Sequence, residues 1–237
     1  MARTQFQAAV DRPQPFTIDR RLPASQQVYE DLRGKILSLE LQPGEALSRP
    51  NLADSYGLSQ TPVRDAFLKL EQEGLVEIYP QSRTVVTKID VDQAREAQFL
   101  RVSIEVETVR ALALDPDKRQ LAPAQQILSQ QRLAFLERGN LSSFSLLDGS
   151  FHLSLCTAVG HPELWELIVL RSGHIDRLRN LNLPDPGKAA TILADHAEIL
   201  QALVSSNAAA AEKAVRQHLS GTLNAVDQIR ERYPAYF

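Results

Sequence analysis

Apolar side chains recur every three or four residues from Ser25 onward, which is the spacing that places them on one face of a helix. This period predicts a first helix that ends before the proline-glycine turn at 42–44. A second helix is expected over 50–56. A third, opened by a Ser or Thr cap and a first-turn proline, is expected from Ser59 to Gly74.

The hydrophobic pattern changes after Gly74. Two short runs rich in β-formers follow, LVEIY at 75–79 and TVVT at 84–87, and the polar segment PQSR joins them. Such a pair predicts a β-hairpin. Three helices followed by a hairpin are typical of a winged helix-turn-helix, which is the arrangement expected for this part of the chain.

Beyond Asp90 the hairpin signals disappear and the helical period returns. Short segments with proline, glycine or asparagine divide this region, and short connections between helices of similar length favour an antiparallel bundle. The predicted fold is therefore mainly α: an N-terminal winged helix-turn-helix (three helices plus a β-hairpin) followed by an all-α antiparallel helical bundle. The expected bundle helices lie near 91–114, 122–138, 141–159, 162–182, 189–205 and 207–232.

The expected domains are a flexible N-terminal arm over 1–21, the winged helix-turn-helix over 22–89 and the all-helical domain over 90–237. With 237 residues, of which 43% are hydrophobic, the chain can form a sizeable core. Its single cysteine excludes an intramolecular disulfide framework and a multi-cysteine zinc site. No apolar stretch is long enough for a signal peptide or a membrane span, so a cytoplasmic protein with no membrane partner is expected.

The formal net charge of −3 shows no basic excess, and residues 1–89 hold 11 Lys and Arg against 11 Asp and Glu. DNA binding must therefore depend on a local motif. In a helix-turn-helix, residues near the start of the second helix reach base edges while others hold phosphates. The expected DNA contacts are Arg33, Arg49, Ser59, Gln60, Thr61, Arg64 and Arg83. From spacing alone, Arg64 and Arg83 are equally compatible with solvated surface charges.

The run ILSLELQPGEALSRPNLADSYGLSQTPVRDAFLKLEQEGLVEIYP resembles the N-terminal domain of the GntR family of bacterial transcription regulators. The similarity extends over residues 25–88, and it implies a homodimer that binds a palindromic double-stranded DNA operator. Two positions depart from the family pattern. Gln60 stands where the family usually has arginine, and the wing lacks the usual glycine near Arg83, so a changed operator sequence is expected.

The C-terminal helices contain four side chains of metal-binding type. Asp148 and His152 are four residues apart and share one helix face. His196 lies ten residues before the expected turn at Ser206 and His218 twelve after it, so both lie at nearly the same depth of an antiparallel pair. The four could bind a divalent ion, with zinc as the first choice and nickel, manganese or iron open. Hydrogen-bonded core histidines and a simple helix-surface pair remain the alternatives.

Three segments, LLDGSFHLSL, DHAEILQAL and AVRQHLSGTL, resemble the FCD domain, the helical ligand-binding domain of the FadR branch of that family. The resemblance implies a metal held by Asp148, His152, His196 and His218. The segment FLRVSIEVETVRALA matches the first helix of that domain, and there Arg101 and Glu105 correspond to residues that face the effector. An arginine fork suits a small carboxylate metabolite. An intrahelical ion pair between Arg101 and Glu105 is the alternative.

The function predicted is that of a DNA-binding transcriptional regulator, a repressor in the commonest case, controlled by an organic acid at the metal site. A metal-dependent hydrolase is the alternative from another class, because three imidazoles and a carboxylate also activate water. A regulator with a purely structural metal is the third possibility. Trp165 is expected in the core or at the dimer interface, and no ligand role is expected for His161 or His174.

Overall fold

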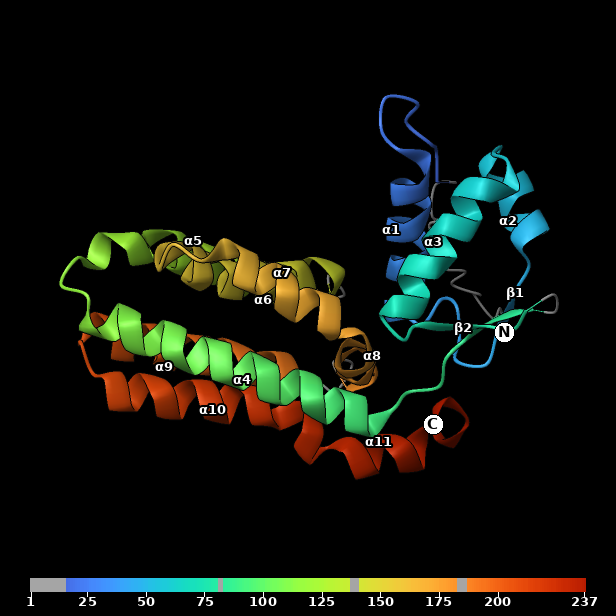
Figure 1. Cartoon of the computed structure of the whole chain (residues 1–237). Coiled ribbons are helices and arrows are strands. Elements are labelled where there is room, and N and C mark those ends of the chain that lie inside the picture. Colours follow the sequence, from blue (N-terminus) through green and yellow to red (C-terminus); the bar gives the residue numbers. More distant parts are fainter. Residues whose placement is uncertain (1–15, 81–82, 137–140, 183–186) are drawn as a thin grey trace, which may run out of the picture.

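The N-terminal part is a three-helix unit with a small sheet at its edge (Figure 1). We describe a computed structural model of the chain over residues 16–80, 83–136, 141–182 and 187–237. The expected arm over 1–21 lies mostly outside these residues. Ser48 caps the second helix by accepting from the amide of Asn51, and Gly57 ends it with a φ of 64°. The helices are α1 (Ala24–Leu37), α2 (Arg49–Tyr56) and α3 (Gln60–Gln72).

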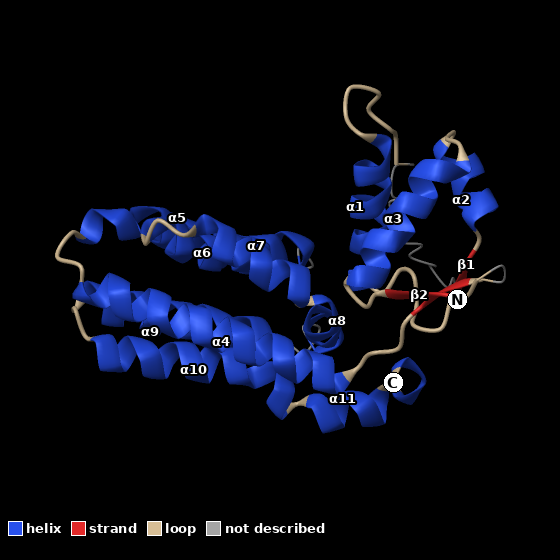
Figure 2. Ribbon diagram, in the orientation of Figure 1, coloured by secondary structure: helices blue, strands red, loops and turns tan. Residues whose placement is uncertain are grey.

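The sheet has three antiparallel strands in the order β1-β3-β2. The predicted hairpin is formed by β2 (Val76–Ile78) and β3 (Thr84–Val86), with Val76 opposite Val86. The strand β1 (Ala46–Leu47) was not predicted, because two residues show no alternation; it pairs with β3 through Ala46 and Val85. Figure 2 shows the sheet in red beside the three helices.

The rest of the described chain is helical (Figures 1 and 2), and none of its helices is long and apolar enough to cross a membrane. Two predicted helices are each divided in the structure. The helix expected over 162–182 breaks at Ser172, and the one expected over 207–232 breaks at Ala225. The helices are α4 (Val91–Leu114), α5 (Ala122–Leu136), α6 (Leu141–Ala158), α7 (Pro162–Arg171), α8 (Gly173–Asn182), α9 (Lys188–Val204), α10 (Ala208–Asn224) and α11 (Val226–Arg232), with short 3-10 turns at Lys118–Leu121 and Pro234–Tyr236.

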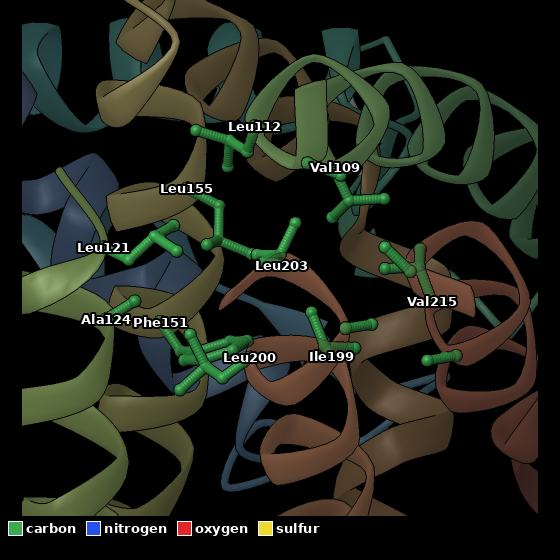
Figure 3. Packing of buried hydrophobic residues seen from close by; sticks show 14 of the residues in the cluster. Val109, Leu112, Leu121, Ala124, Phe151, Leu155, Ile199, Leu200, Leu203 and Val215 are labelled. Atoms are coloured by element: carbon green, nitrogen blue, oxygen red, sulfur yellow. The ribbon is translucent and has the colours of Figure 1, made fainter. Parts of the chain in front are cut away.

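Each of the two parts has its own cluster of buried apolar side chains. In the N-terminal part, the buried side chains of α1, α3 and the sheet form one cluster around Leu32 and Phe67. In the helical part, α4, α5, α6, α9 and α10 contribute to a larger cluster, in which Phe151, Leu155 and Leu203 lie close together (Figure 3). Burying such side chains stabilises the fold by about 1.5–3 kcal/mol each.

Helix α8 lies between the two parts. Gly173 begins it, and a Cβ atom at this position would lie 2.6 Å from Cδ2 of Leu75, so the glycine allows close contact with the N-terminal part. Arg177 is fully buried, and its Nη1 donates to the backbone oxygen of Thr87 at 2.6 Å. His174 accepts from the amide of Asp90 through Nδ1 at 2.9 Å. Asn180 donates to the backbone oxygen of Leu37 at 2.7 Å.

The acceptor role of His174 predicts a pH dependence of stability. Burial, followed by repulsion from Arg177, lowers its pKa from 6.5 to about 4, although Asp90 acts in the opposite direction. As the pH falls, His174 is therefore protonated in the unfolded chain before it is protonated in the folded protein. The contribution of neutral His174 to the free energy of unfolding is fully present above pH 6.5 and is lost as the pH falls toward 4. The total loss is roughly 3 kcal/mol.

We expect His174→Asn, whose side-chain oxygen can still accept from the amide of Asp90, to lose less stability than the wild type between pH 6.5 and 4. Urea unfolding of both proteins at a series of pH values measures this difference. The contributions of the other histidines are the same in both proteins and cancel when the two pH profiles are subtracted. Parallel pH profiles for the two proteins would show that His174 is not the group responsible.

Candidate functional site

Four side chains from three helices converge in the helical part. Asp148 and His152 come from α6, His196 from α9 and His218 from α10, and their ligand-type atoms lie within 4.8 Å of one another. The Nε2 atom of His218 lies 3.3 Å from that of His196 and 3.2 Å from that of His152. Asp148 Oδ1 lies 3.5 Å from His196 Nε2. The structure thus brings together all four residues predicted as metal ligands.

The other ring nitrogen of each histidine faces a hydrogen-bond acceptor. Nδ1 of His152 lies 2.6 Å from Glu105 Oε2, and Nδ1 of His196 lies 2.9 Å from Gln131 Oε1. Nδ1 of His218 lies 3.3 Å from Asp195 Oδ2. A carboxylate or amide oxygen at Nδ1 selects the tautomer with the proton on Nδ1 and leaves Nε2 as a lone-pair donor. All three Nε2 lone pairs are therefore directed at a shared centre.

This arrangement fits a divalent cation. Two nitrogen atoms bound at about 2.1 Å to one ion lie about 3.0 Å apart in octahedral and about 3.4 Å apart in tetrahedral geometry, and the observed separations lie between these values. Three lone pairs facing one another at this distance repel unless a cation lies among them. Within the described part of the chain, Asp148 Oδ1 is also buried without a hydrogen-bond partner. The donor set is therefore suited to hold a divalent metal ion.

Electrostatics keep the cluster in the form that metals require. Burial is the largest influence on the pKa of both His152 and His196, and it lowers both, so these rings remain neutral. For Asp148, burial alone would raise the pKa, but positive charge on the surrounding histidines, when they are protonated, and on Arg101 outweighs it and lowers the pKa below its usual range. Neutral imidazoles and an ionised carboxylate are the metal-binding states of these side chains.

Arg101 and Glu105, expected at the effector, form the intrahelical ion pair that was the alternative, with Nε of Arg101 2.5 Å from Glu105 Oε1. Both side chains are buried. Glu105 also contacts His152 through its second oxygen, so both of its oxygens are already engaged. Arg101 Nη2 has no hydrogen-bond partner among the described residues. The arginine is thus the member of this pair that retains a donor for a ligand.

A cavity of about 830 Å³ adjoins the cluster. Asp148, His218 and Arg101 line it, and so does Trp165, which was expected in the core or at a dimer interface. The ring of Trp165 stacks on His152 with centroids 5.6 Å apart. The cavity extends to α1 of the winged helix-turn-helix, where Gly34, Leu37 and Ser38 line it. A molecule bound beside the cluster can therefore contact both parts of the protein.

Glu105 offers a test of the orienting contact. We expect Glu105→Gln to weaken divalent metal binding by about 10–100-fold, because a neutral amide orients and polarises His152 less strongly than a carboxylate. Titration calorimetry with zinc and manganese measures the change. Glu107→Gln, on the exposed part of the same helix, makes the same substitution and is expected to leave the affinity unchanged. Equal affinities for wild type and Glu105→Gln would contradict the orienting role.

The predicted DNA contacts fall into two groups. Six of them are exposed at the start of α2, the start of α3 and the hairpin. Arg49 Nε donates to Gln60 Oε1 at 3.1 Å, so the unusual Gln60 is joined to a neighbouring arginine. In the hairpin, Arg83 lies over the ring of Tyr79, 5.4 Å from its centre. The six exposed residues are Arg49, Ser59, Gln60, Thr61, Arg64 and Arg83.

Arg33 lies elsewhere. Its Nε donates to Glu73 at 2.7 Å, and its Nη2 donates to the backbone oxygen of Val169 in α7, also at 2.7 Å. These contacts place Arg33 between the winged helix-turn-helix and the helical part, and they do not support its predicted role at DNA. Gln131 and Asp195, which hold two of the histidines, were missed by the sequence analysis, although Asp195 directly precedes His196.

The chain is similar to known proteins along most of its length. Residues 24–86 match the family model described as bacterial regulatory proteins, gntR family, and residues 96–221 match the FCD domain. A Streptomyces ambofaciens protein described as an uncharacterized HTH-type transcriptional regulator in an unstable DNA locus is 35% identical over 89% of this chain and 88% of its own length. The HTH-type transcriptional repressor RspR of Escherichia coli is 34% identical over 91% of this chain and 94% of its own.

Solved structures share the fold. Escherichia coli McbR/YncC aligns with a TM-score of 0.71 at 21% identity and covers 90% of this chain and 99% of its own. A putative GntR regulator from a Rhodococcus species also has a TM-score of 0.71 at 21% identity, over 86% and 96% of the two chains. The relatives are transcriptional regulators and not enzymes, which excludes the hydrolase alternative.

Proposed function

The chain belongs to the GntR family of bacterial regulatory proteins and carries an FCD domain, and from that premise we propose that it is a metal-dependent, organic-acid-responsive repressor. Members of this family bind DNA operators and typically act as dimers, and FCD domains often bind a metal. The observation that carries the proposal is the convergence of three Nε2 atoms and one carboxylate on the wall of a cavity.

The bound metal would be held by Asp148, His152, His196 and His218, and it would supply a Lewis-acidic centre for an oxygen ligand. Arg101 contributes a buried guanidinium to the same cavity. Burial works against its charge, but Glu105 and Asp148 outweigh burial and raise its pKa, so it stays a cation. A carboxylate satisfies the free donor of Arg101. This chemistry favours a small organic acid as the effector.

Helix α8 provides a connection between the effector cavity and DNA. Asp176, Arg179 and Asn180 line the cavity, whereas Arg177 donates to the backbone oxygen of Thr87 in the N-terminal part. A ligand that moves one face of α8 therefore changes the contact made by the other. For such a switch, the effector must bind the two arrangements with different affinities. The repressor role is supported by the name of the relative RspR, which is 34% identical.

The proposal is tested with the protein's own upstream DNA. We expect retardation of that fragment in a gel shift at low salt, and release when the metal-loaded protein is given its organic acid, found by a thermal-shift screen. If the protein binds a metal and is stabilised by it, but the metal-loaded form binds no organic acid, a purely structural metal is favoured instead. Failure to shift the fragment at low salt would contradict the regulator function at this operator.

Arg64 and Gln60 test the recognition surface. Because Gln60 Oε1 accepts from Arg49, the joined pair presents mainly N–H donors, which match the acceptors O6 and N7 of guanine better than the edge of adenine. We expect Arg64→Ala to weaken operator binding by about 10–100-fold. Gln60→Ala should relax the preference at one base pair per half-site, measured by binding selection from randomised operators. Arg95→Ala, outside this surface, is the control.

A further inference from the structure

Three cationic side chains from three different helices line the cavity. Arg101, Arg179 and Lys188 line it from α4, α8 and α9 respectively. Two acidic residues line it as well, but Asp148 belongs to the metal-type cluster. Asp176 is the remaining lining acid and pairs with Arg179, while Arg101 pairs with Glu105, so two of the three cations have an acidic partner. Both arginines still keep N–H donors for a further acceptor, and Lys188 adds a third cationic group. The cavity wall can therefore accept a second anionic group.

Arg179 is placed to receive that group. Its Nη1 donates to Asp176 Oδ1 at 2.7 Å, and each side chain of this pair is 25% exposed. The guanidinium has five N–H donors, and a pair made through one nitrogen leaves donors for another acceptor. Burial, followed by repulsion from Arg101, lowers the pKa of Arg179. The repulsion between these two guanidinium groups is relieved when each of them binds an anionic group.

The dimensions of the cavity agree with a ligand larger than one carboxylate. Its volume of about 830 Å³ lies in the upper part of the range for small-molecule pockets, about 300–1,000 Å³. It extends from His218 at the cluster to Leu37 in α1. A molecule that reaches across this space has its second end near α8 and α1.

We propose that the effector has two anionic groups, one held beside Arg101 at the metal-type cluster and the other held by Arg179, in a cavity that Lys188 also lines. This inference rests on the proposed function. On binding, Arg179 exchanges part of its contact with Asp176 for the second anionic group of the ligand. Because Asn180 of the same helix donates to Leu37 of α1, the exchange occurs at the junction with the DNA-binding part.

The test compares acids that differ by one carboxylate. The full-length protein, loaded with manganese, is titrated calorimetrically with lactate and malate, and with gluconate and glucarate as a longer pair. We expect the diacid of at least one pair to bind about tenfold or more tightly than its monoacid, the ratio that one charge-assisted contact supplies. Arg179→Met should remove this preference and leave the metal content unchanged, because Arg179 is not one of the four converging ligand residues.

Arg171→Met, an exposed arginine on α7, is the matched control and should keep the preference. Three outcomes are distinguishable. If neither diacid is preferred by the wild type, or if Arg179→Met retains the preference, the two-anion inference is wrong. If a monoacid binds while the diacid does not, it is also wrong. If no acid of either kind binds the metal-loaded protein, the effector part of the proposed function itself fails for these acids.

Discussion

Replacing His196 by alanine will abolish tight divalent metal binding. His196 supplies one of the four converging ligand atoms, and losing a direct ligand is expected to cost more than the 10–100-fold typical of a supporting contact. A metal present at about 1,000 times its Kd stabilises the folded protein by about 4 kcal/mol, and this increment should disappear. Elemental analysis and thermal unfolding with and without zinc measure both effects.

His161→Ala is the matched control, because His161 is an exposed histidine outside the cluster. The variant at 196 also removes the stacking of His196 on Phe151, whose centroids lie 4.0 Å apart, so the metal-free stability of each variant must be measured as its baseline. An unchanged metal content and an unchanged zinc-dependent rise in Tm in His196→Ala would show that the metal is bound by other residues.

Replacing Arg177 by alanine will loosen the contact between the two parts of the protein. The buried guanidinium donates to the backbone oxygen of Thr87, and its Nη2 lies 2.9 Å from His174 Nδ1. Alanine leaves these acceptors with fewer donors and creates a cavity, which should lower the free energy of unfolding by about 3 kcal/mol. We expect thermal unfolding to separate into two transitions, one for each part.

Arg177→Met distinguishes charge from volume. Burial removes the hydration of the Arg177 guanidinium and lowers its pKa to about 10, so its charge is disfavoured at this position. Methionine fills most of the space and removes that cost, so it should retain more stability than alanine while still losing the hydrogen bond to Thr87. If Arg177→Ala unfolds in one transition with wild-type stability, this contact does not join the two parts.

The helical period was sufficient to predict most of the fold, but not the junction between its parts. The apolar spacing continues through Ser172, so the sequence gives little sign that α7 ends there and that α8 takes a separate direction. The two-residue strand β1 is too short to show a pattern. Arg33 resembles a surface cation in sequence, yet its partners Glu73 and Val169 are distant along the chain.

The candidate metal cluster was predictable because its spacing follows helix geometry. Asp148 and His152 share a face, and the Ser206 turn sets His196 and His218 at one depth. The supporting contacts were less accessible, since Gln131 reaches His196 from α5 and only tertiary packing brings them together. Glu105 was predicted at the effector, and that role stays a prediction, whereas its contacts support the orientation of His152.

The turn between α9 and α10 also determines where the chain can change length. Ser206 adopts a left-handed φ of 55° and reverses the direction of the chain there. One residue inserted in α10 before His218 would rotate that side chain by about 100° and move it by about 1.5 Å, out of reach of His196. Homologues that keep this cluster should therefore preserve the number of residues from His196 through the Ser206 turn to His218, and accept insertions and deletions in loops outside this segment.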